Sequence, residues 1–301
     1  MKPVLGLIGL GNIGEPICRH LIKEGYAVFV YDVDREAVAQ LEDTTAEPTE
    51  SPRALASVAD VVLLSLPNSV VVEEIVLGED GLAESLSPGK VVIDTSSSKP
   101  SSTRTISGRL AEAGIDMLDA PVSGGVMKAR KGTLAVMVGG RREVFERCLP
   151  ILQAFGGEIF FVGDHGTGHL AKSLNNLLSA TTLASAAEAV ILAERAGLSP
   201  DLFVEVINAS NGRSYSTEVK FPKYILNRSF EDGFATALMS KDLKIALEAA
   251  AEMDVPMLIG STVAQVWQAA VAQGNGARSH TEIYAFLENM TGSQDAGAKA
   301  P

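Results

Sequence analysis

Apolar residues in the first half of the chain follow two alternating patterns. Short continuous runs occur in VLGLIG, YAVFVYD, DVVLLSLP, KVVIDTSS, IDMLDAP, TLAVMVGG and EIFFVG. The segments between them, such as EPICRHLIKEG and REVFERCLPILQAFG, carry their apolar residues on one helical face. Apolar runs that are regularly separated by amphipathic helices predict a mostly parallel sheet with helices on both faces.

The pattern changes near residue 164. From there onward only helical periodicity occurs, interrupted by the turn-forming segments GLSP, NASNGRS, DVP and GNGARS. A long helix over about residues 168–195 opens this half. The sequence therefore predicts an α/β N-terminal domain over 1–164 and an all-α C-terminal domain over 165–291, joined by a long interdomain helix. The small polar residues of 292–301 predict a flexible tail.

The charge balance narrows the range of partners. The chain has 301 residues and a net charge of −12, and so acidic a surface disfavours nucleic acid and anionic membranes, although a local basic pocket could still bind a small anionic substrate. The most apolar stretch, 177–193, is interrupted by Thr, Ser and Glu188, so we expect no membrane span. The first predicted strand begins near residue 4, which leaves no room for a targeting peptide.

Cysteine and histidine usage adds two expectations. Cys18 and Cys148 have no cysteine near them in sequence, and the four histidines show no metal-ligand spacing. This usage predicts a protein of a reducing compartment without a structural metal. We therefore expect a cytoplasmic protein.

The first apolar run leads into GLIGLGNIGEP, which contains the pattern Gly-x-Gly-x-x-Gly. A strand before this pattern and a helix after it make it a dinucleotide-binding fingerprint, in which the helix N-terminus receives the phosphates. The N-terminal domain is therefore predicted to be of the Rossmann type. The residues predicted to bind the cofactor in this loop are Gly9, Leu10, Gly11, Asn12, Ile13 and Gly14.

Asp32 ends the second predicted strand, close to the position at which an acid binds the adenosine ribose. A carboxylate there accepts hydrogen bonds from the ribose hydroxyls and repels a 2′-phosphate, which favours NAD over NADP. Arg35 could hold a 2′-phosphate if its loop turned inward, so NADP is the alternative cofactor. A surface aspartate on a generic strand–turn–helix is the other interpretation of Asp32.

Polar residues follow several other predicted strands. Because ligands bind beyond the carboxyl ends of strands in an open parallel sheet, these residues are candidates for contacts with a ligand. For the cofactor they are Leu66, Pro67 and Thr95. In DAPVSGG, Ser123, Gly124 and Gly125 offer a hydroxyl and two unobstructed N–H groups, which could cradle a carboxylate. A glycine turn before a surface helix is the alternative interpretation of that segment.

The helix that opens the second half begins GTGHLAKSLNN, with a lysine near the start of an otherwise apolar helix. Lys172 and Asn176 are four residues apart and share a helical face. An amine in a partly apolar pocket loses proton affinity, so it can take a proton from an alcohol near neutral pH. Asn175 lies about 100° round the helix and is the second choice as a partner. A solvated surface lysine is the other interpretation.

Four segments together resemble the β-hydroxyacid dehydrogenase family, the group of 3-hydroxyisobutyrate dehydrogenases and tartronate semialdehyde reductases. They are GLIGLGNIGEP, DAPVSGGVMKARKGTLAVMVGG, GTGHLAKSLNNLL and LMSKDLKIAL, and the similarity runs over about residues 4–290. The resemblance implies a Rossmann-type domain followed by a helical domain that builds a dimer. It also implies the reversible oxidation of a small 3-hydroxy acid to its semialdehyde.

The same resemblance implies roles for single residues. Lys172 would be the catalytic acid/base and Asn176 its partner. The substrate-binding residues would be Ser123, Gly124, Gly125, Asn175 and Lys241. Lys241 would also lie beside the nicotinamide, and Thr95 beside the nicotinamide ribose.

The chain also departs from its apparent relatives. Many reductases of the group carry Asn-Arg-Thr where this chain has Asp32-Val33-Asp34, and they use NADPH. NAD-linked oxidation is therefore favoured. Arg278 and His280 stand where many relatives have an aspartate followed by a serine, and an extra cation there would suit a second anionic group. Arg213 in NGRS is a further cation whose role the sequence leaves open.

Three functions remain in competition. The leading one is an NAD-dependent dehydrogenase of a small 3-hydroxy acid that acts as a homodimer or homotetramer. The second is an NADPH-dependent semialdehyde or imine reductase, although imine reductases usually lack the lysine. The third is a cofactor-binding module without enzymatic activity, for which the sequence offers little support because no residue of the catalytic set is missing.

Overall fold

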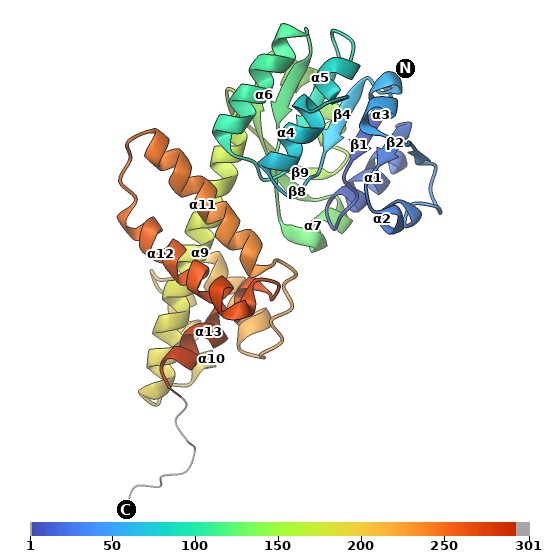
Figure 1. The fold of residues 1–301 in the computed structure, drawn as a ribbon. Helices are drawn as coiled ribbons and strands as arrows, with labels where there is room; N and C mark the ends of the chain where they lie inside the picture. Colours follow the sequence, from blue (N-terminus) through green and yellow to red (C-terminus); the bar gives the residue numbers. More distant parts are fainter. Residues whose placement is uncertain (1, 293–301) are drawn as a thin grey trace, which may run out of the picture. The chain divides into compact units, whose positions relative to one another are not determined.

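The computed structural model describes residues 2–292, which divide between Ser173 and Leu174 into two compact units (Figure 1). The division falls inside α9 (Thr167–Arg195), so this helix belongs to both units. The expected domain boundary after residue 164 stays a prediction. The tail predicted at 292–301 lies, apart from Gly292, outside the described residues.

The first unit is built on a nine-stranded sheet in the order β3-β2-β1-β4-β5-β6-β8-β7, with β9 paired to β8. Every pair from β3 to β6 is parallel, β8 runs antiparallel to β6 and β7, and β9 is parallel to β8. The predicted mostly parallel sheet is therefore confirmed. The strands are β1 Leu5–Ile8, β2 Val28–Tyr31, β3 Glu47–Pro48, β4 Val61–Leu64, β5 Val91–Asp94, β6 Asp116–Asp119, β7 Val122–Ser123, β8 Leu134–Gly140 and β9 Gly156–Gly163.

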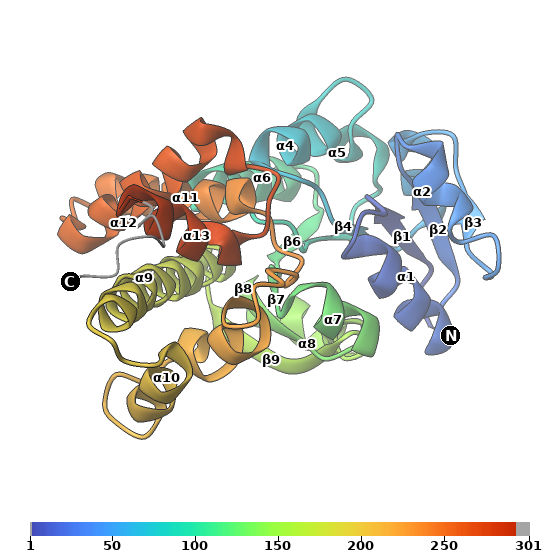
Figure 2. The ribbon, with the colours of Figure 1, turned by 90° about the horizontal axis from the view of Figure 1, so that it is seen from below.

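Helices cover both faces of this sheet (Figure 2). The central strand β4 is apolar throughout because both of its faces are buried. Val61 and Leu63 face one hydrophobic cluster, and Val62 and Leu64 face another. The first cluster contains residues of α1 (Gly14–Lys23), α7 (Gly125–Lys131) and α8 (Arg142–Leu152). The second contains residues of α3 (Pro52–Val58), α4 (Ser69–Leu77), α5 (Leu82–Ser85) and α6 (Pro100–Glu112). A strand buried on both faces loses the alternation of apolar and polar residues that marks a half-exposed strand.

The helices of the first unit confirm most of the pattern read from the sequence. Two short helices, α3 and α5, and the two-residue strand β3 are not predicted, because such short elements carry too few apolar positions to show a period. The helices are α1 Gly14–Lys23, α2 Arg35–Ala39, α3 Pro52–Val58, α4 Ser69–Leu77, α5 Leu82–Ser85, α6 Pro100–Glu112, α7 Gly125–Lys131 and α8 Arg142–Leu152.

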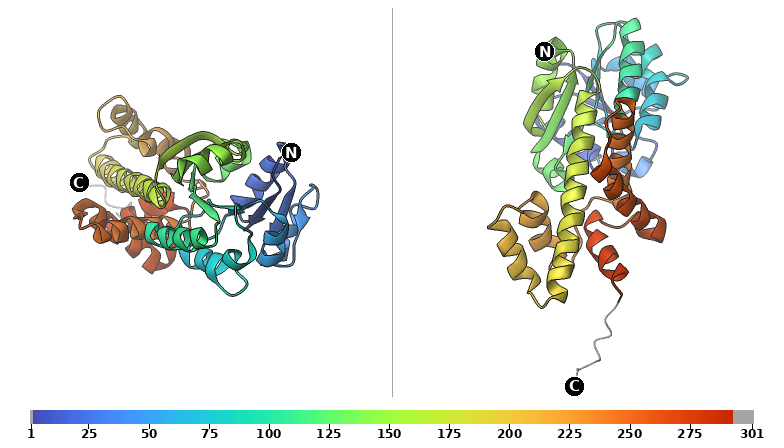
Figure 3. Two further views of the ribbon diagram at one scale, coloured as in Figure 1. Left: turned by 90° about the horizontal axis from the view of Figure 1, so that it is seen from above. Right: turned by 90° about the vertical axis from the view of Figure 1, so that its left-hand side faces the viewer.

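The second unit is helical, as predicted, and α9 forms its axis. Figures 2 and 3 show α9 between α10 on one side and α11, α12 and α13 on the other. Apolar residues from all of these helices form one buried cluster around Trp267 and Phe221. The elements are α10 Pro200–Asn208, the π-helix η1 Ser216–Ile225, α11 Thr236–Glu252, α12 Leu258–Ala270, the π-helix η2 Val271–Asn275, the 3₁₀-helix η3 His280–Glu282 and α13 Ile283–Met290.

By length and composition alone, α9 could cross a membrane. Half of its most apolar window is buried inside the protein, and its polar residues Lys172, Ser173 and Asn176 are buried as well. The core helix of a globular domain meets the same criterion, so the length of α9 gives no support to a membrane assignment.

We expect opposite effects on stability from two glycine-to-alanine substitutions in the first unit. A Cβ at Gly14 would lie 2.0 Å from the carbonyl oxygen of Gly9, whereas a Cβ at Gly108, in the exposed interior of α6, would meet nothing within 4 Å. Gly14→Ala should lower the free energy of unfolding by about 1–3 kcal/mol through overpacking. Gly108→Ala should raise it by about 0.5–1 kcal/mol. Urea denaturation of both variants tests this, and a stable Gly14→Ala protein would contradict the close helix–loop contact.

Candidate active site

The loop between β1 and α1 has the geometry that a dinucleotide requires. Gly9 has a φ of +94°, and a Cβ there would lie 2.3 Å from the carbonyl oxygen of Ser65 on the neighbouring strand connection. Gly11 and Asn12 are exposed, and a Cβ at Gly11 would meet nothing within 4 Å. Leu10 is buried and Ile13 is half-buried. The backbone N–H groups at the start of α1 are therefore open to a phosphate group.

Asp32 is fixed at the end of β2 by two backbone groups. Its Oδ2 accepts a hydrogen bond from the N–H of Leu10 at 2.6 Å, and its Oδ1 accepts one from the N–H of Asp34 at 2.8 Å. The first bond ties the carboxylate to the glycine loop itself. The next residue, Val33, is 85% exposed, which is unusual for a valine and leaves an apolar surface beside the carboxylate. This chain's residues thus fit an adenosine nucleotide at this position.

Two neighbouring loops also fit the cofactor prediction. Leu66 and Pro67 follow β4, and the N–H of Leu66 donates to Ser96 Oγ at 2.9 Å. Thr95 follows β5, is 4% exposed, and donates its hydroxyl to the carbonyl oxygen of Leu64 at 2.6 Å. Since β1, β4 and β5 are parallel neighbours, these loops and the glycine loop lie at one edge of the sheet.

Ser123 ends β7, and the two glycines after it take up backbone conformations that side chains rarely adopt. Gly124 has a φ of +128° and Gly125 a φ of +66°. A Cβ at Gly124 would clash with the side chain of Lys128, whereas one at Gly125 would meet nothing within 4 Å. Successive N–H groups in such a turn form a concave site that binds anions.

The start of α9 is anchored to the sheet by a buried carboxylate. Asp119, at the end of β6, is fully buried and accepts hydrogen bonds from the N–H groups of Gly166 at 2.8 Å and His169 at 3.1 Å. Burial raises the pKa of this carboxyl, although the nearby His169 and the two N–H groups oppose that rise. A Cβ at Gly168 would lie 2.4 Å from the carbonyl oxygen of Met137, so only glycine allows α9 to begin this close to the sheet.

The ring of His169 strengthens the same anchor. Its Nε2 lies 3.1 Å from the carbonyl oxygen of Ser96 and therefore donates to it, because a carbonyl oxygen can only accept. Its Nδ1 lies 2.7 Å from Thr103 Oγ1 on α6. The carboxylate of Asp94, at the end of β5, lies 3.6 Å from Nε2. The turn of α9 that precedes Lys172 is therefore held by β5, β6 and α6.

Two of the predicted site residues that follow this anchor along α9 are buried. Lys172 is 8% exposed and Asn176 is 6% exposed, whereas Asn175 is exposed. In the second unit, Asn176 Nδ2 donates to Asp242 Oδ2 at 2.5 Å. Lys241 Nζ lies 3.5 Å from Asp242 Oδ1, and that buried oxygen makes no hydrogen bond within the described part of the chain. Asp242 thus contacts both Asn176 and Lys241, two of the predicted site residues.

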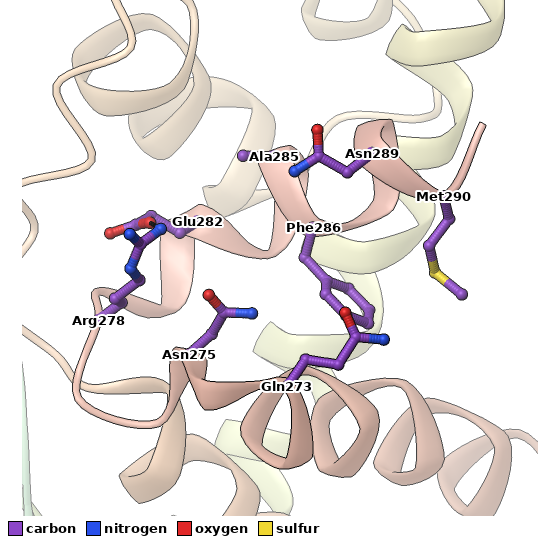
Figure 4. A pocket seen from close by; sticks show the side chains of 8 residues that line it. All are labelled: Gln273, Asn275, Arg278, Glu282, Ala285, Phe286, Asn289 and Met290. Carbon is purple, nitrogen blue, oxygen red and sulfur yellow. Dashed lines mark hydrogen bonds and ion pairs between the residues drawn. The ribbon is translucent and has the colours of Figure 1, made fainter. Parts of the chain in front are cut away.

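The two C-terminal candidates behave differently from one another. Arg278 is exposed, donates to Glu282 Oε2 at 2.8 Å, and lines a cavity of about 310 Å³ together with residues of η2 and α13 (Figure 4). His280 is 2% exposed, and burial lowers its pKa. His280 is therefore not an additional cation, and the positive charge of Arg278 is already balanced. Arg213 is exposed on the loop after α10.

Neither cysteine is a candidate nucleophile. Cys18 and Cys148 are free and buried, and burial raises the pKa of the Cys18 thiol to about 12 and that of Cys148 to about 11. Across residues 2–292, no group of three or more His, Cys, Asp or Glu side chains is arranged to hold a metal ion.

Comparison with known proteins decides the family. A family model described as the NAD binding domain of 6-phosphogluconate dehydrogenase matches residues 4–163. A second, described as NAD-binding of NADP-dependent 3-hydroxyisobutyrate dehydrogenase, matches residues 166–287. The chain belongs to the β-hydroxyacid dehydrogenase family. It is thus an NAD(P)-dependent hydroxyacid dehydrogenase, as its sequence predicts.

Three relatives illustrate the range of this dehydrogenase family. The 2-(hydroxymethyl)glutarate dehydrogenase of Eubacterium barkeri is 39% identical, with 98% of each chain covered. The NAD-dependent L-serine dehydrogenase of Pseudomonas aeruginosa is 36% identical, with 96% of this chain and 99% of the relative covered. The structure of Mycobacterium tuberculosis 3-hydroxyisobutyrate dehydrogenase with L-serine matches with a TM-score of 0.89 and 31% identity, over 95% of this chain and 99% of the other.

Sequence reasoning did not single out three buried polar residues of this dehydrogenase, namely His169, Asp242 and Lys220. A signal for two of them is present in the helical periodicity. His169 precedes Lys172 by three residues on α9, and Asp242 falls between Met239 and Leu243 on the buried face of α11. A charged or polar residue on an otherwise apolar helical face indicates a buried polar contact. For Lys220, in a π-helix, that periodicity gives no signal.

We expect His169→Ala to destabilise the first unit by about 2–4 kcal/mol, because it removes two buried hydrogen bonds and leaves a cavity beside Asp94. His165→Ala is the matched control. His165 lies four residues earlier, is only half-buried, and makes one hydrogen bond, to the carbonyl oxygen of Met117 at 3.1 Å. Its loss should cost about 1 kcal/mol or less. Chemical denaturation followed by circular dichroism measures both, and equal effects would contradict the anchoring role of His169.

Proposed function

We propose that the protein is an NAD-dependent dehydrogenase that interconverts a small 3-hydroxy acid and its semialdehyde, with Lys172 as general acid/base. The observation that carries the proposal is a buried lysine and a buried asparagine four residues apart on one face of α9. A lysine is rarely buried without a partner or a task. An amine beside an amide suits a reaction in which an alcohol must be held and deprotonated.

The names of the relatives support a definite substrate skeleton. 2-(Hydroxymethyl)glutarate, 3-hydroxyisobutyrate and L-serine share the structure HOCH₂–CH(X)–COO⁻. They differ only in X, which is a carboxyethyl group, a methyl group or an ammonium group. The substrate proposed for this chain has the same skeleton, so the chemistry is the oxidation of a primary alcohol next to a carbon that bears a carboxylate.

The chain's own residues divide the work as follows. The amine of Lys172 takes the hydroxyl proton during oxidation and returns it during reduction, and Asn176, held by Asp242, orients the same oxygen. The nicotinamide ring, when bound, supplies the acceptor for the hydride. Ser123 and the N–H groups of Gly124 and Gly125 hold the carboxylate. Fixing the alcohol in this way can lower the barrier by several kcal/mol, on the order of 5 or more.

The second candidate is an NADPH-dependent semialdehyde reductase. Arg35 is exposed beside the predicted ribose position, where it could bind the 2′-phosphate of NADPH, so this function remains an alternative. The observation against it is the bond from Leu10 N–H to Asp32, which holds a negative charge where a 2′-phosphate would have to lie. An imine reductase remains the weaker alternative, because the lysine that such enzymes usually lack is present and buried.

The location and assembly of the protein are part of the same proposal. We expect a cytoplasmic homodimer or homotetramer. The second unit exposes several large apolar side chains on α9 and α12, among them Leu178, Leu192, Leu258 and Ile259, all more than 60% exposed. Exposed apolar surface on these two helices supports association with another chain.

The proposal is tested with a panel of 2-substituted 3-hydroxypropanoates and NAD, by following the absorbance of NADH. Lys172→Met should lower kcat by about 10²–10⁴-fold, the range typical of general acid–base catalysis, while the affinity for NADH stays within about twofold. Lys244→Met is the control, because Lys244 is 67% exposed on α11 and pairs with Glu248. Full activity of Lys172→Met, or no turnover of any acid in the panel by the native protein, would refute the proposed chemistry.

Replacing Asp32 should change the cofactor preference. Asp32→Asn keeps an oxygen for the Leu10 N–H but removes the negative charge, so the ratio of kcat/KM for NAD to that for NADP should fall about 10-fold or more. Asp34→Asn is the matched control. Asp34 caps α2 by accepting from the N–H of Glu36 at 2.9 Å, and asparagine caps a helix equally well. An unchanged ratio in Asp32→Asn would remove Asp32 from the cofactor site.

A further inference from the structure

The second unit contains a buried lysine that the chemistry above does not use. Lys220, in the π-helix η1, is only 6% exposed. Its Nζ lies 3.0 Å from Ser179 Oγ on α9 and 2.8 Å from His280 Nε2. Lysine side chains are almost never buried to this degree unless they are paired or functional. The burial of this amine therefore indicates a structural or functional role for its contacts.

The ring of His280 fixes the direction of the Lys220 side chain. His280 Nδ1 lies 3.0 Å from Asp232 Oδ1 and 3.1 Å from the carbonyl oxygen of Phe234. Both neighbours accept, so Nδ1 carries the hydrogen, and in a neutral ring Nε2 is then free to accept from the ammonium group of Lys220. Burial lowers the pKa of His280, which agrees with a neutral ring.

Asp232 completes this chain of contacts and remains a carboxylate. Burial is the largest single effect and would raise its pKa, but the contact with His280, the N–H of Phe234 and the charge of Lys220 together hold the pKa below its ordinary value. The neutral ring thus separates the carboxylate from the ammonium group. The ammonium group of Lys220 is held beside Ser179 by hydrogen bonds that run from Lys220 to His280 and from His280 to Asp232.

The position of Ser179 on α9 relates this amine to the reaction. Ser179 follows Asn176 by three residues and Lys172 by seven, and with about 3.6 residues per turn all three share one face of the helix. Seven residues correspond to about 10 Å along the axis. In a substrate whose second carboxylate is four bonds from the hydroxymethyl carbon, the two groups are about 5 Å apart. Such a substrate and a lysine side chain can together span the distance along the helix. Ser179, which the amine of Lys220 contacts, therefore lies about two turns along α9 from Lys172 on the same face.

We propose that Lys220 and Ser179 form a subsite for a second anionic group, so that the preferred substrate is HOCH₂–CH(X)–COO⁻ in which X ends in a carboxylate. His280 and Asp232 are positioning residues for Lys220. The inference rests on the proposed function and adds to it the chemical class of X. An ammonium group as X would be repelled by Lys220, and a methyl group would leave the charge without a partner from the substrate.

The experiment compares three acids with NAD on the full-length protein, namely 2-(hydroxymethyl)glutarate, 3-hydroxyisobutyrate and L-serine. The native protein should prefer the dicarboxylate by about 10-fold or more in kcat/KM, the usual value of a hydrogen bond to a charged group. Lys220→Met should raise KM for the dicarboxylate by about 10–100-fold and change kcat/KM for 3-hydroxyisobutyrate by less than about threefold. Lys223→Met, on the exposed side of the same π-helix, should leave all constants unchanged.

Ser179→Ala keeps the proposal testable if Lys220→Met does not fold, because it removes one hydroxyl without disturbing a buried charge. It should lower kcat/KM for the dicarboxylate alone, by about 3–10-fold. Equal losses for mono- and dicarboxylate, or a native preference for L-serine, would overturn the subsite and leave the proposed function intact. Failure of all three acids to react would instead overturn the proposed function.

Discussion

The structure depends on one buried carboxylate, that of Asp119, which connects the end of β6 to the start of α9. Asp119 ends β6 and accepts hydrogen bonds from two N–H groups at the start of α9. Those N–H groups have no partners within a helix, so a carboxylate there satisfies them and also complements the helix dipole. Leaving them without a partner in the interior would cost a few kcal/mol, on the order of 1–3 for each group. The register of α9 against the sheet follows from this contact, and the position of Lys172 one turn later follows from that register.

Helix α9 is largely apolar in composition but carries buried polar side chains on one face. The apolar face of α9 from Leu177 to Ile191 packs into the apolar cluster of the second unit, and the length and hydropathy of the helix are those of a core helix. One face nevertheless carries His169, Lys172, Asn176 and Ser179, each with a hydrogen-bonding task or a buried position. Buried polar groups are tolerated only where partners satisfy them. The partners come from β5 and α6 near the start of the helix, from α11 beside Asn176, and from η1 beside Ser179.

The sequence was sufficient for the architecture and for the dehydrogenase family, but not for the buried contacts of α9. The catalytic roles of Lys172 and Asn176 stay predictions. Continuous apolar runs identify strands buried on both faces, and Gly9, Gly11 and Gly14 between a strand and a helix identify the cofactor loop, because both signals are local. The antiparallel placement of β8 between β6 and β7 is not visible in the chain, since pairing direction depends on distant segments. For the same reason Asp242 and Lys220 could not be assigned as partners of α9. His280, a candidate cation by sequence, is neutral in the interior because burial outweighs the attraction of Asp232.

These buried contacts suggest how one scaffold can serve substrates that differ only in X. The cofactor loop, the Ser123 turn and the Asp119 anchor all belong to the first unit, to which the proposed function assigns the contacts with the part that the substrates share. The residues that would meet X belong to the second unit, where Lys220 is supplied by a π-helix rather than by the sheet. A π-helix carries one extra residue per turn, which redirects the side chains that follow it, and such segments occur frequently at functional sites. A change at Lys220, Ser179 or His280 would then alter the charge offered to X without disturbing the anchor of Lys172, so substrate class could diverge while the proton-transfer chemistry stays constant.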